Sequence, residues 1–191
     1  MDFYTMYAEA CVENYVQLTD GLQSLQRGCL NSEFQYLDKK PLTVEVSEDG
    51  GTEFPDFILT GLGNCIPLIS DKFKRLLDGL YINNLFYKQV YLTISSLGIK
   101  ESYWLALPPR IRCLDYERSV IEKEDNEYLP EKELIRGAKD IVINSAAVGN
   151  YQIFRLADVV NQDIVVVDKL KSALSKADLE NVYFSKLGGN I

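Results

Sequence analysis

The 191-residue chain contains no histidine. That absence excludes catalytic triads and dyads with an imidazole base, as well as zinc sites with histidine ligands. Cysteines are few, and no two of them form a Cys-x-x-Cys pair of the kind that binds zinc or an iron–sulfur cluster. We therefore expect no metal or other cofactor, and four reduced thiols in a cytosolic protein: Cys11, Cys29, Cys65 and Cys113. Chemistry that uses a carboxylate, lysine, tyrosine or cysteine stays open.

Long apolar segments are missing as well. The longest stretches without a charged residue, residues 57–70 and 141–154, have 14 residues each, whereas a membrane-spanning helix needs about 18 or more. The first 18 residues carry three acids and no basic side chain, which is the opposite of a signal peptide. These features predict a cytoplasmic protein that does not contact a membrane.

Basic residues are the scarcer charged class. Lysine and arginine number 20 against 28 aspartates and glutamates, which gives a net charge of −8. Such a field repels phosphate backbones and attracts basic proteins, so we expect no nucleic-acid partner. Between Pro41 and Asp71 no basic residue occurs at all. The simplest interpretation is a solvated loop, and the more specific one is a docking patch whose carboxylates are Glu45, Glu48, Asp49, Glu53 and Asp56.

A second charged segment, Asp115 to Glu133, contains eight acids and predicts a hairpin or exposed loop. Its acids Asp115, Glu117, Glu122 and Glu124 form the second-choice docking site. Asp115 and Glu117 would share one face of a strand, where they could bind a cation or transfer a proton. Because no second ligand cluster accompanies this pair, we expect no catalytic residues here.

The chain resembles itself at a fixed distance. Shifted by 97 residues, its halves align without a gap, so that Phe57 falls on Phe154 and Asn84 on Asn181. Eight of the 35 positions from residue 55 to 89 are identical. Two similar units could arise by chance, but the constant offset favours duplication.

The repeat predicts a single domain over residues 1–191, with a pseudo-repeat of residues 37–89 and 134–186. Alternating or apolar runs predict strands at 42–46, 57–59 and 66–69, and at 141–143, 153–156 and 164–167. Further strands are expected at 84–92, 103–107, 111–114 and 181–186, with the aromatic side chains Phe86, Tyr87, Tyr183 and Phe184 in the core.

One helix is expected in each half, after the third strand. Ser70 or Asp71 can cap the first helix, and Gly79 can end it in the left-handed conformation. Apolar side chains at helical spacing should face the core: Phe73, Leu76 and Leu77 in the first helix, and Leu170, Ala173 and Leu174 in the second. The fold class is therefore α+β, with two related strand–helix–strand halves and a mixed, largely antiparallel sheet.

Three segments together resemble a known family. They are residues 54–60 with 69–77, residues 113–119, and residues 153–156 with 167–171. Their order and spacing are similar to those of immunity family eleven of bacterial polymorphic-toxin systems, over about residues 34–187. The resemblance implies a small cytoplasmic protein that binds a cognate toxin, encoded by the adjacent gene, and blocks it without being an enzyme.

The charge agrees with that implication, because an acidic inhibitor associates faster with a basic toxin. Two alternatives stay open. One is an enzyme or small-ligand-binding protein that uses carboxylates in a cleft between the two halves, and the other is a structural module of a secretion-associated complex. The identity of the toxin and the oligomeric state do not follow from the sequence.

Overall fold

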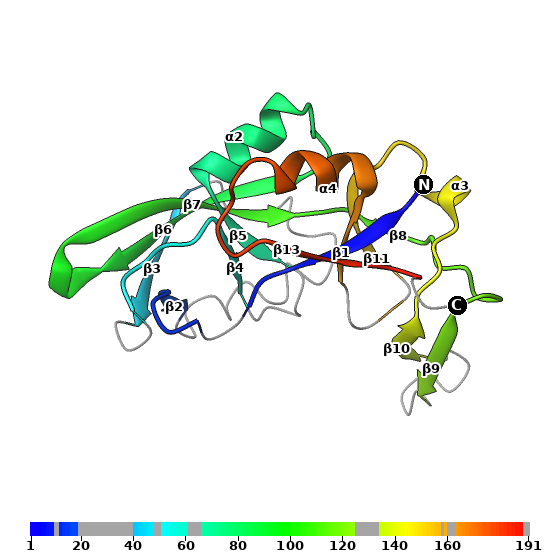
Figure 1. The fold of residues 1–191 in the computed structure, drawn as a ribbon. Helices are drawn as coiled ribbons and strands as arrows, with labels where there is room; N and C mark the ends of the chain where they lie inside the picture. Colours follow the sequence, from blue (N-terminus) through cyan, green and yellow to red (C-terminus); the bar gives the residue numbers. More distant parts are fainter. Residues whose placement is uncertain are drawn as a thin grey trace.

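The computed structural model describes residues 1–9, 12–18, 40–47, 51–60, 66–124, 134–157, 159 and 163–188. The strands form two mixed sheets and a separate two-stranded sheet, and the helices are short (Figure 1). Within these ranges, parallel ladders join β3 (Leu42–Ser47) to β6 (Phe86–Ile94) and β8 (Arg110–Ile111) to β11 (Ile153–Leu156), and the other ladders are antiparallel. The predicted α+β class is therefore confirmed. No helix in the described ranges is long and apolar enough to cross a membrane.

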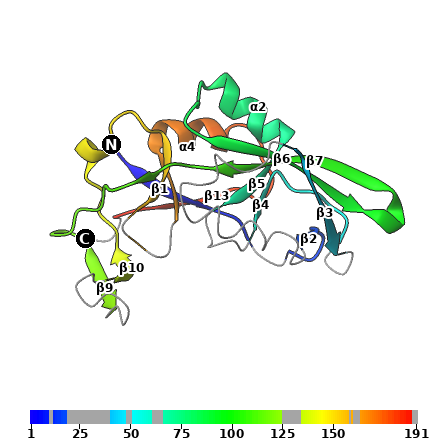
Figure 2. The same ribbon diagram turned by 180° about the vertical axis from the view of Figure 1, so that it is seen from behind.

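The first sheet has the strand order β2-β3-β6-β7-β5-β4. Its further strands are β2 (Gln17–Leu18), β4 (Phe57–Leu59), β5 (Pro67–Ser70) and β7 (Ile99–Leu107). β6 and β7 form a long hairpin whose turn is the short 3-10 helix Ser95–Leu97 followed by Gly98, which has a left-handed φ of 66°. Figures 1 and 2 show this hairpin reaching outward beyond α2 (Asp71–Gly79).

The second sheet has the order β13-β1-β12-β11-β8. It contains β1 (Phe3–Tyr7), β12 (Ile164–Val167) and β13 (Tyr183–Lys186). All residues of β11 and β12 are buried, as expected for short apolar strands that are covered on both faces. β1 thus lies in the interior of the sheet, between β13 and β12.

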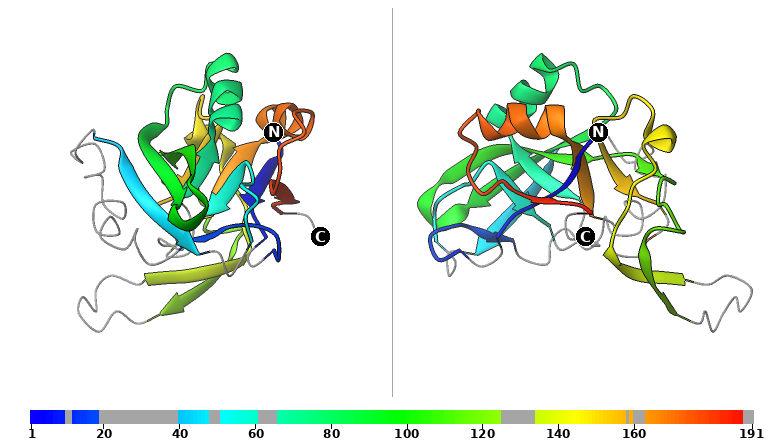
Figure 3. Two further views of the ribbon diagram at one scale, coloured as in Figure 1. Left: turned by 90° about the vertical axis from the view of Figure 1, so that its left-hand side faces the viewer. Right: turned by 45° about the vertical axis from the view of Figure 1, so that its right-hand side comes forward.

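α2 and α4 (Asp168–Ser175) lie on the same side of the molecule (Figures 1 and 3). α2 packs on β5 and β7, and α4 packs on β12 and β1. Of the six predicted core residues, Phe73, Leu77, Leu170 and Leu174 are buried, whereas Leu76 and Ala173 are half-buried. Ser70 caps α2 by accepting a hydrogen bond from the amide of Phe73 at 3.1 Å, which confirms the first capping prediction. The prediction for the C-terminal end of α2 was wrong, because the residue in the left-handed conformation is Tyr81 (φ 58°) rather than Gly79.

The two halves correspond element by element. β5, α2 and β6 begin 97 residues before β12, α4 and β13. β4 and β11 instead correspond at an offset of 96. The equivalent amides of Ser70 and Val167, 97 residues apart, donate to the carbonyls of Asp56 and Gln152, which are 96 residues apart. One residue has therefore been gained or lost between the second and third strand of a half. That the two halves arose by duplication, and that the chain forms a single domain, remain predictions.

When the chain is divided after residue 97, the first strand of each half lies in the sheet of the other half. β1 lies between β12 and β13, and β7 lies between β5 and β6. β1 and β7 correspond to each other at an offset of 100 residues. Thr5 on β1 pairs with Val165, and Leu105 on β7 pairs with Leu68, the residue that corresponds to Val165. Side-chain contacts agree as well: the ammonium of Lys171 lies over the ring of Tyr4 as that of Lys74 lies over the ring of Trp104. We name this arrangement the strand exchange.

Several sequence predictions differ from the structure. Residues 141–143 form no ladder, and Ile143 makes only an isolated bridge to Leu114. The predicted strand at 111–114 is reduced to β8 and that bridge. Phe86 and Tyr183 are exposed rather than in the core. Phe86 precedes the buried alternation of β6, and no residue of the edge strand β13 is buried.

The charged segment forms a hairpin of β9 (Val120–Glu124) and β10 (Leu134–Asp140), which lies apart from the two sheets (Figure 3). A single helical turn, α3 (Ser145–Val148), follows it. Cys113 is buried, whereas the predictions for Cys11, Cys29 and Cys65 lie outside the described residues.

Candidate docking surface

The nine carboxylates predicted to bind a partner lie in different settings. Glu48 and Asp49 lie outside the described residues, as does the side chain of Glu124. Glu53 and Glu122 are exposed. The other four are Glu45, Asp56, Asp115 and Glu117, and the structure gives three of them a defined structural role.

Glu45 holds the turn of the β6–β7 hairpin. Its carboxylate accepts hydrogen bonds from Thr93 Oγ1 at 2.6 Å, from the amide of Ser95 at 2.6 Å and from Ser95 Oγ at 2.8 Å. The bond from Thr93, followed by those from Ser95, holds the pKa of Glu45 below its ordinary value. The side chain is exposed, so a partner can still reach it, but its oxygens already bind the hairpin.

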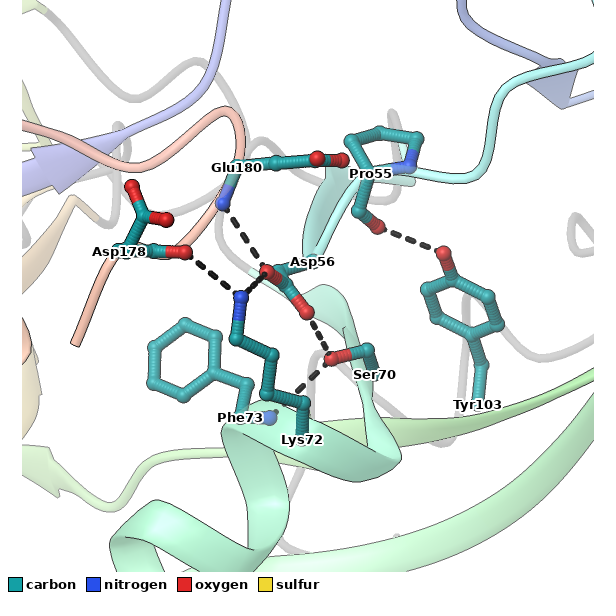
Figure 4. Close-up of polar contacts among 8 residues, drawn as sticks. All are labelled: Pro55, Asp56, Ser70, Lys72, Phe73, Tyr103, Asp178 and Glu180. Atoms are coloured by element: carbon teal, nitrogen blue, oxygen red, sulfur yellow. Dashed lines mark hydrogen bonds and ion pairs between the residues drawn. The ribbon is translucent and has the colours of Figure 1, made fainter.

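Asp56 is buried, which corrects its assignment to an exposed surface. Its carboxylate accepts hydrogen bonds from Ser70 Oγ, from Lys72 Nζ at 3.1 Å and from the amide of Glu180 at 3.0 Å (Figure 4). Lys72 Nζ also donates to the carbonyl of Asp178 at 2.6 Å. A buried carboxylate needs such partners, and here they come from both halves. Asp56 therefore joins the halves.

Two asparagines strengthen the same junction. Asn84 Nδ2 donates to the carbonyl of Ile153 at 3.0 Å, and Asn181 Nδ2 donates to that of Phe57 at 3.2 Å. Asn181 also bonds both backbone groups of Glu9. These residues carry no charge and were not predicted as functional, although their identity across the repeat was a signal for a shared structural role.

Glu53 lies on the surface beside the N-terminal segment. Its amide bonds the carbonyl of Asn14 at 3.0 Å, and its carbonyl accepts from the amide of Val16 at 3.0 Å. Gly51 makes this approach possible, because its φ is 115° and a Cβ there would lie 2.3 Å from the Asn14 carbonyl oxygen. The Glu53 side chain is exposed, so a partner can reach its carboxylate.

Asp115 forms a turn rather than half of an ion-binding pair. Its Oδ1 accepts from the amides of Glu117 at 3.2 Å and Arg118 at 3.1 Å, and its carbonyl accepts from the amide of Ser119. This geometry starts the β9–β10 hairpin. Across the described part of the chain, no three histidine, cysteine or acidic residues gather where they could hold a metal ion.

A family model described as "Immunity protein family (Imm11)" matches residues 7–189. No curated protein matches the chain.

Proposed function

Because the chain belongs to the immunity protein family Imm11, we propose that it neutralises a cognate toxin by binding to it in the cytoplasm. The observation that carries this proposal is the match over residues 7–189, which spans both sheets. The side chains support binding over catalysis. Histidine is absent, and the carboxylates of Asp56 and Asp115 are used to hold the structure.

The net charge of −8 supports a basic partner. The preferred docking segment runs from Pro41 to Asp71, and the second choice is the charged segment Asp115–Glu133, which contains the exposed Glu122. Within the preferred segment, the exposed acid Glu53 is better placed to bind than the buried Asp56. Loops carried on a rigid scaffold are where binding residues concentrate.

Co-expression with the toxin domain encoded by the adjacent gene tests this function. Growth should be restored when the two proteins are present in equal amounts, and the purified proteins should form a complex. An enzyme acting in a cleft would instead protect at amounts far below those of the toxin. Protection without complex formation would contradict inhibition by binding.

Charge reversal of the predicted patch locates the surface. Replacing Glu48, Asp49 and Glu53 by lysine should slow association at low salt and flatten its salt dependence, because steering by charge is screened. Glu45→Lys is made separately, since Glu45 also holds the hairpin turn. An unchanged association rate would direct attention to residues 115–133.

A further inference from the structure

Two tyrosines lie exposed next to each other at one edge of the second sheet, on the edge strand β13 and on its neighbour β1. Tyr7 on β1 faces Tyr183 on β13, and their ring centroids are 5.8 Å apart. Their exposed fractions are 40% and 39%. Tyrosine presents a large, rigid contact area with few rotatable bonds, which is why it is frequent among residues that dominate binding energy.

Three exposed glutamates and a third tyrosine surround this pair. Tyr15 is bridged to Glu53. Burial, and then the charges of Glu180, Tyr183, Glu53 and Glu9, raise the pKa of the Tyr15 hydroxyl, so these groups lie within electrostatic reach of each other. We define the tyrosine surface by these six residues: Tyr7, Glu9, Tyr15, Glu53, Glu180 and Tyr183.

The backbone beneath the tyrosine surface is held firmly. Asn181, which is buried, accepts from the amide of Glu9 at 3.0 Å and donates to the carbonyl of Glu9 at 3.3 Å. The amide of Glu180 is bonded to Asp56 Oδ2. Segments that are far apart in the sequence are thereby fixed side by side, which lowers the entropy lost on binding.

The fold does not require these side chains. At the positions that correspond in the other half, Leu107 replaces Tyr7, Pro109 replaces Glu9, Asn83 replaces Glu180 and Phe86 replaces Tyr183. The same backbone is thus built there with neither a tyrosine nor an acid. The combination at the tyrosine surface therefore needs an explanation other than folding.

We propose that the tyrosine surface is the docking site for a basic face of the cognate toxin, an inference that rests on the proposed function. Tyr7 and Tyr183 supply the contact area, and Glu9, Glu53 and Glu180 supply the complementary charge. Lysine and arginine side chains of the toxin would lie over the tyrosine rings and pair with the glutamates at the rim.

Two variants and a matched control test the site against the toxin domain encoded by the adjacent gene. The first variant carries Glu9→Lys, Glu53→Lys and Glu180→Lys. The second carries Tyr7→Ala and Tyr183→Ala. The control carries Asp78→Lys, Glu101→Lys and Asp168→Lys, which are exposed acids outside the tyrosine surface and outside both candidate docking segments, and which change the net charge by the same amount. Melting temperatures establish that each variant is folded.

Binding kinetics at low salt give the answer. The glutamate variant should slow association by about tenfold or more relative to the control, and the tyrosine variant should raise the dissociation rate by about tenfold or more. Rates equal to those of the control variant would overturn the tyrosine surface. Wild-type chain that neither binds nor protects against the toxin would instead overturn the proposed function, and the site with it.

Hydrogen exchange of the wild-type complex gives a reading that needs no variant. Toxin should slow exchange at amides of residues 7–9, 15–16 and 180–183 by about tenfold or more. Protection confined to the β9–β10 hairpin would overturn the tyrosine surface while leaving the proposed function intact.

Discussion

Asn84 and Asn181 make the same hydrogen bond from opposite halves of the molecule. Each stands just before the last strand of its half, and each donates from Nδ2 to a carbonyl on the other half: that of Ile153 for Asn84 and that of Phe57 for Asn181. The two carbonyls correspond under the 96-residue offset of β4 and β11. Two equivalent hydrogen bonds therefore hold the junction between the halves.

Removing the Asn181 side chain should destabilise the whole protein. Asn181→Gly keeps the left-handed φ of 61° without strain, but leaves the Phe57 carbonyl and the backbone of Glu9 without their partner. We expect a loss of about 1–3 kcal/mol in the free energy of unfolding, measured by urea denaturation. Asn84→Ala, which removes one bond, should cost less, and an Asn181→Gly protein as stable as wild type would contradict this account.

Tyr87→Phe should leave stability unchanged or raise it. Burial raises the pKa of the Tyr87 hydroxyl, and that hydroxyl is buried without a hydrogen-bond partner among the described residues. The corresponding residue in the second half is Phe184. We expect a gain of up to about 1–2 kcal/mol. The matched control is Tyr103→Phe, which should destabilise, because Tyr103 donates to the carbonyl of Pro55 at 2.6 Å. Losses of equal size in both variants would show that Tyr87 has a partner.

Glu45→Gln should loosen the β6–β7 turn in a pH-dependent way. Because the folded-state pKa of Glu45 is lowered, its contribution is present above its ordinary value of 4.5 and is lost as pH falls through the lowered value. The amide of Ser95 should therefore exchange faster in the variant at neutral pH, and the difference should vanish at low pH. Equal exchange rates at neutral pH would show that the turn does not depend on Glu45.

A circular permutant should fold. The first and the last described segments lie together, because Asp2 and Lys186 form an ion pair at 2.9 Å and the amide of Leu187 bonds the carbonyl of Phe3. A chain joined from Ile191 to Met1 by a glycine-rich linker and opened between Leu97 and Gly98 keeps every strand pair, since the new ends fall in an exposed turn. Circular dichroism and a melting curve check this. The same permutation opened between Val90 and Tyr91, inside β6, should not fold.

The local parts of the fold could be predicted from sequence. Helix boundaries at Ser70 and buried positions such as Phe73 and Leu174 follow from capping and periodicity, and the 97-residue offset located both units. The strand exchange could not be predicted, because β1 has the same alternation whether it joins its own half or the other one. Its correspondence with β7 also falls at a different offset.

The docking carboxylates were harder to predict for a related reason. Whether an aspartate such as Asp56 is exposed depends on donors brought to it from elsewhere, here Ser70, Lys72 and the amide of Glu180. All three donors are distant from Asp56 in the sequence, so their contacts with it could not be predicted. The tyrosines at residues 7 and 183 were missed because their strands, 176 residues apart, pair only in the folded chain.

The strand exchange has a consequence for synthesis on the ribosome. Phe3 pairs with Val167, which is synthesised 164 residues later. At roughly 5–20 residues per second, β1 waits for roughly 8–30 s before its neighbours exist. Throughout that time the side chains of Phe3 and Met6, which are buried in the folded protein, cannot pack against the second sheet. The nascent β1 is thus a natural substrate for a holdase chaperone until β12 and β13 have been made.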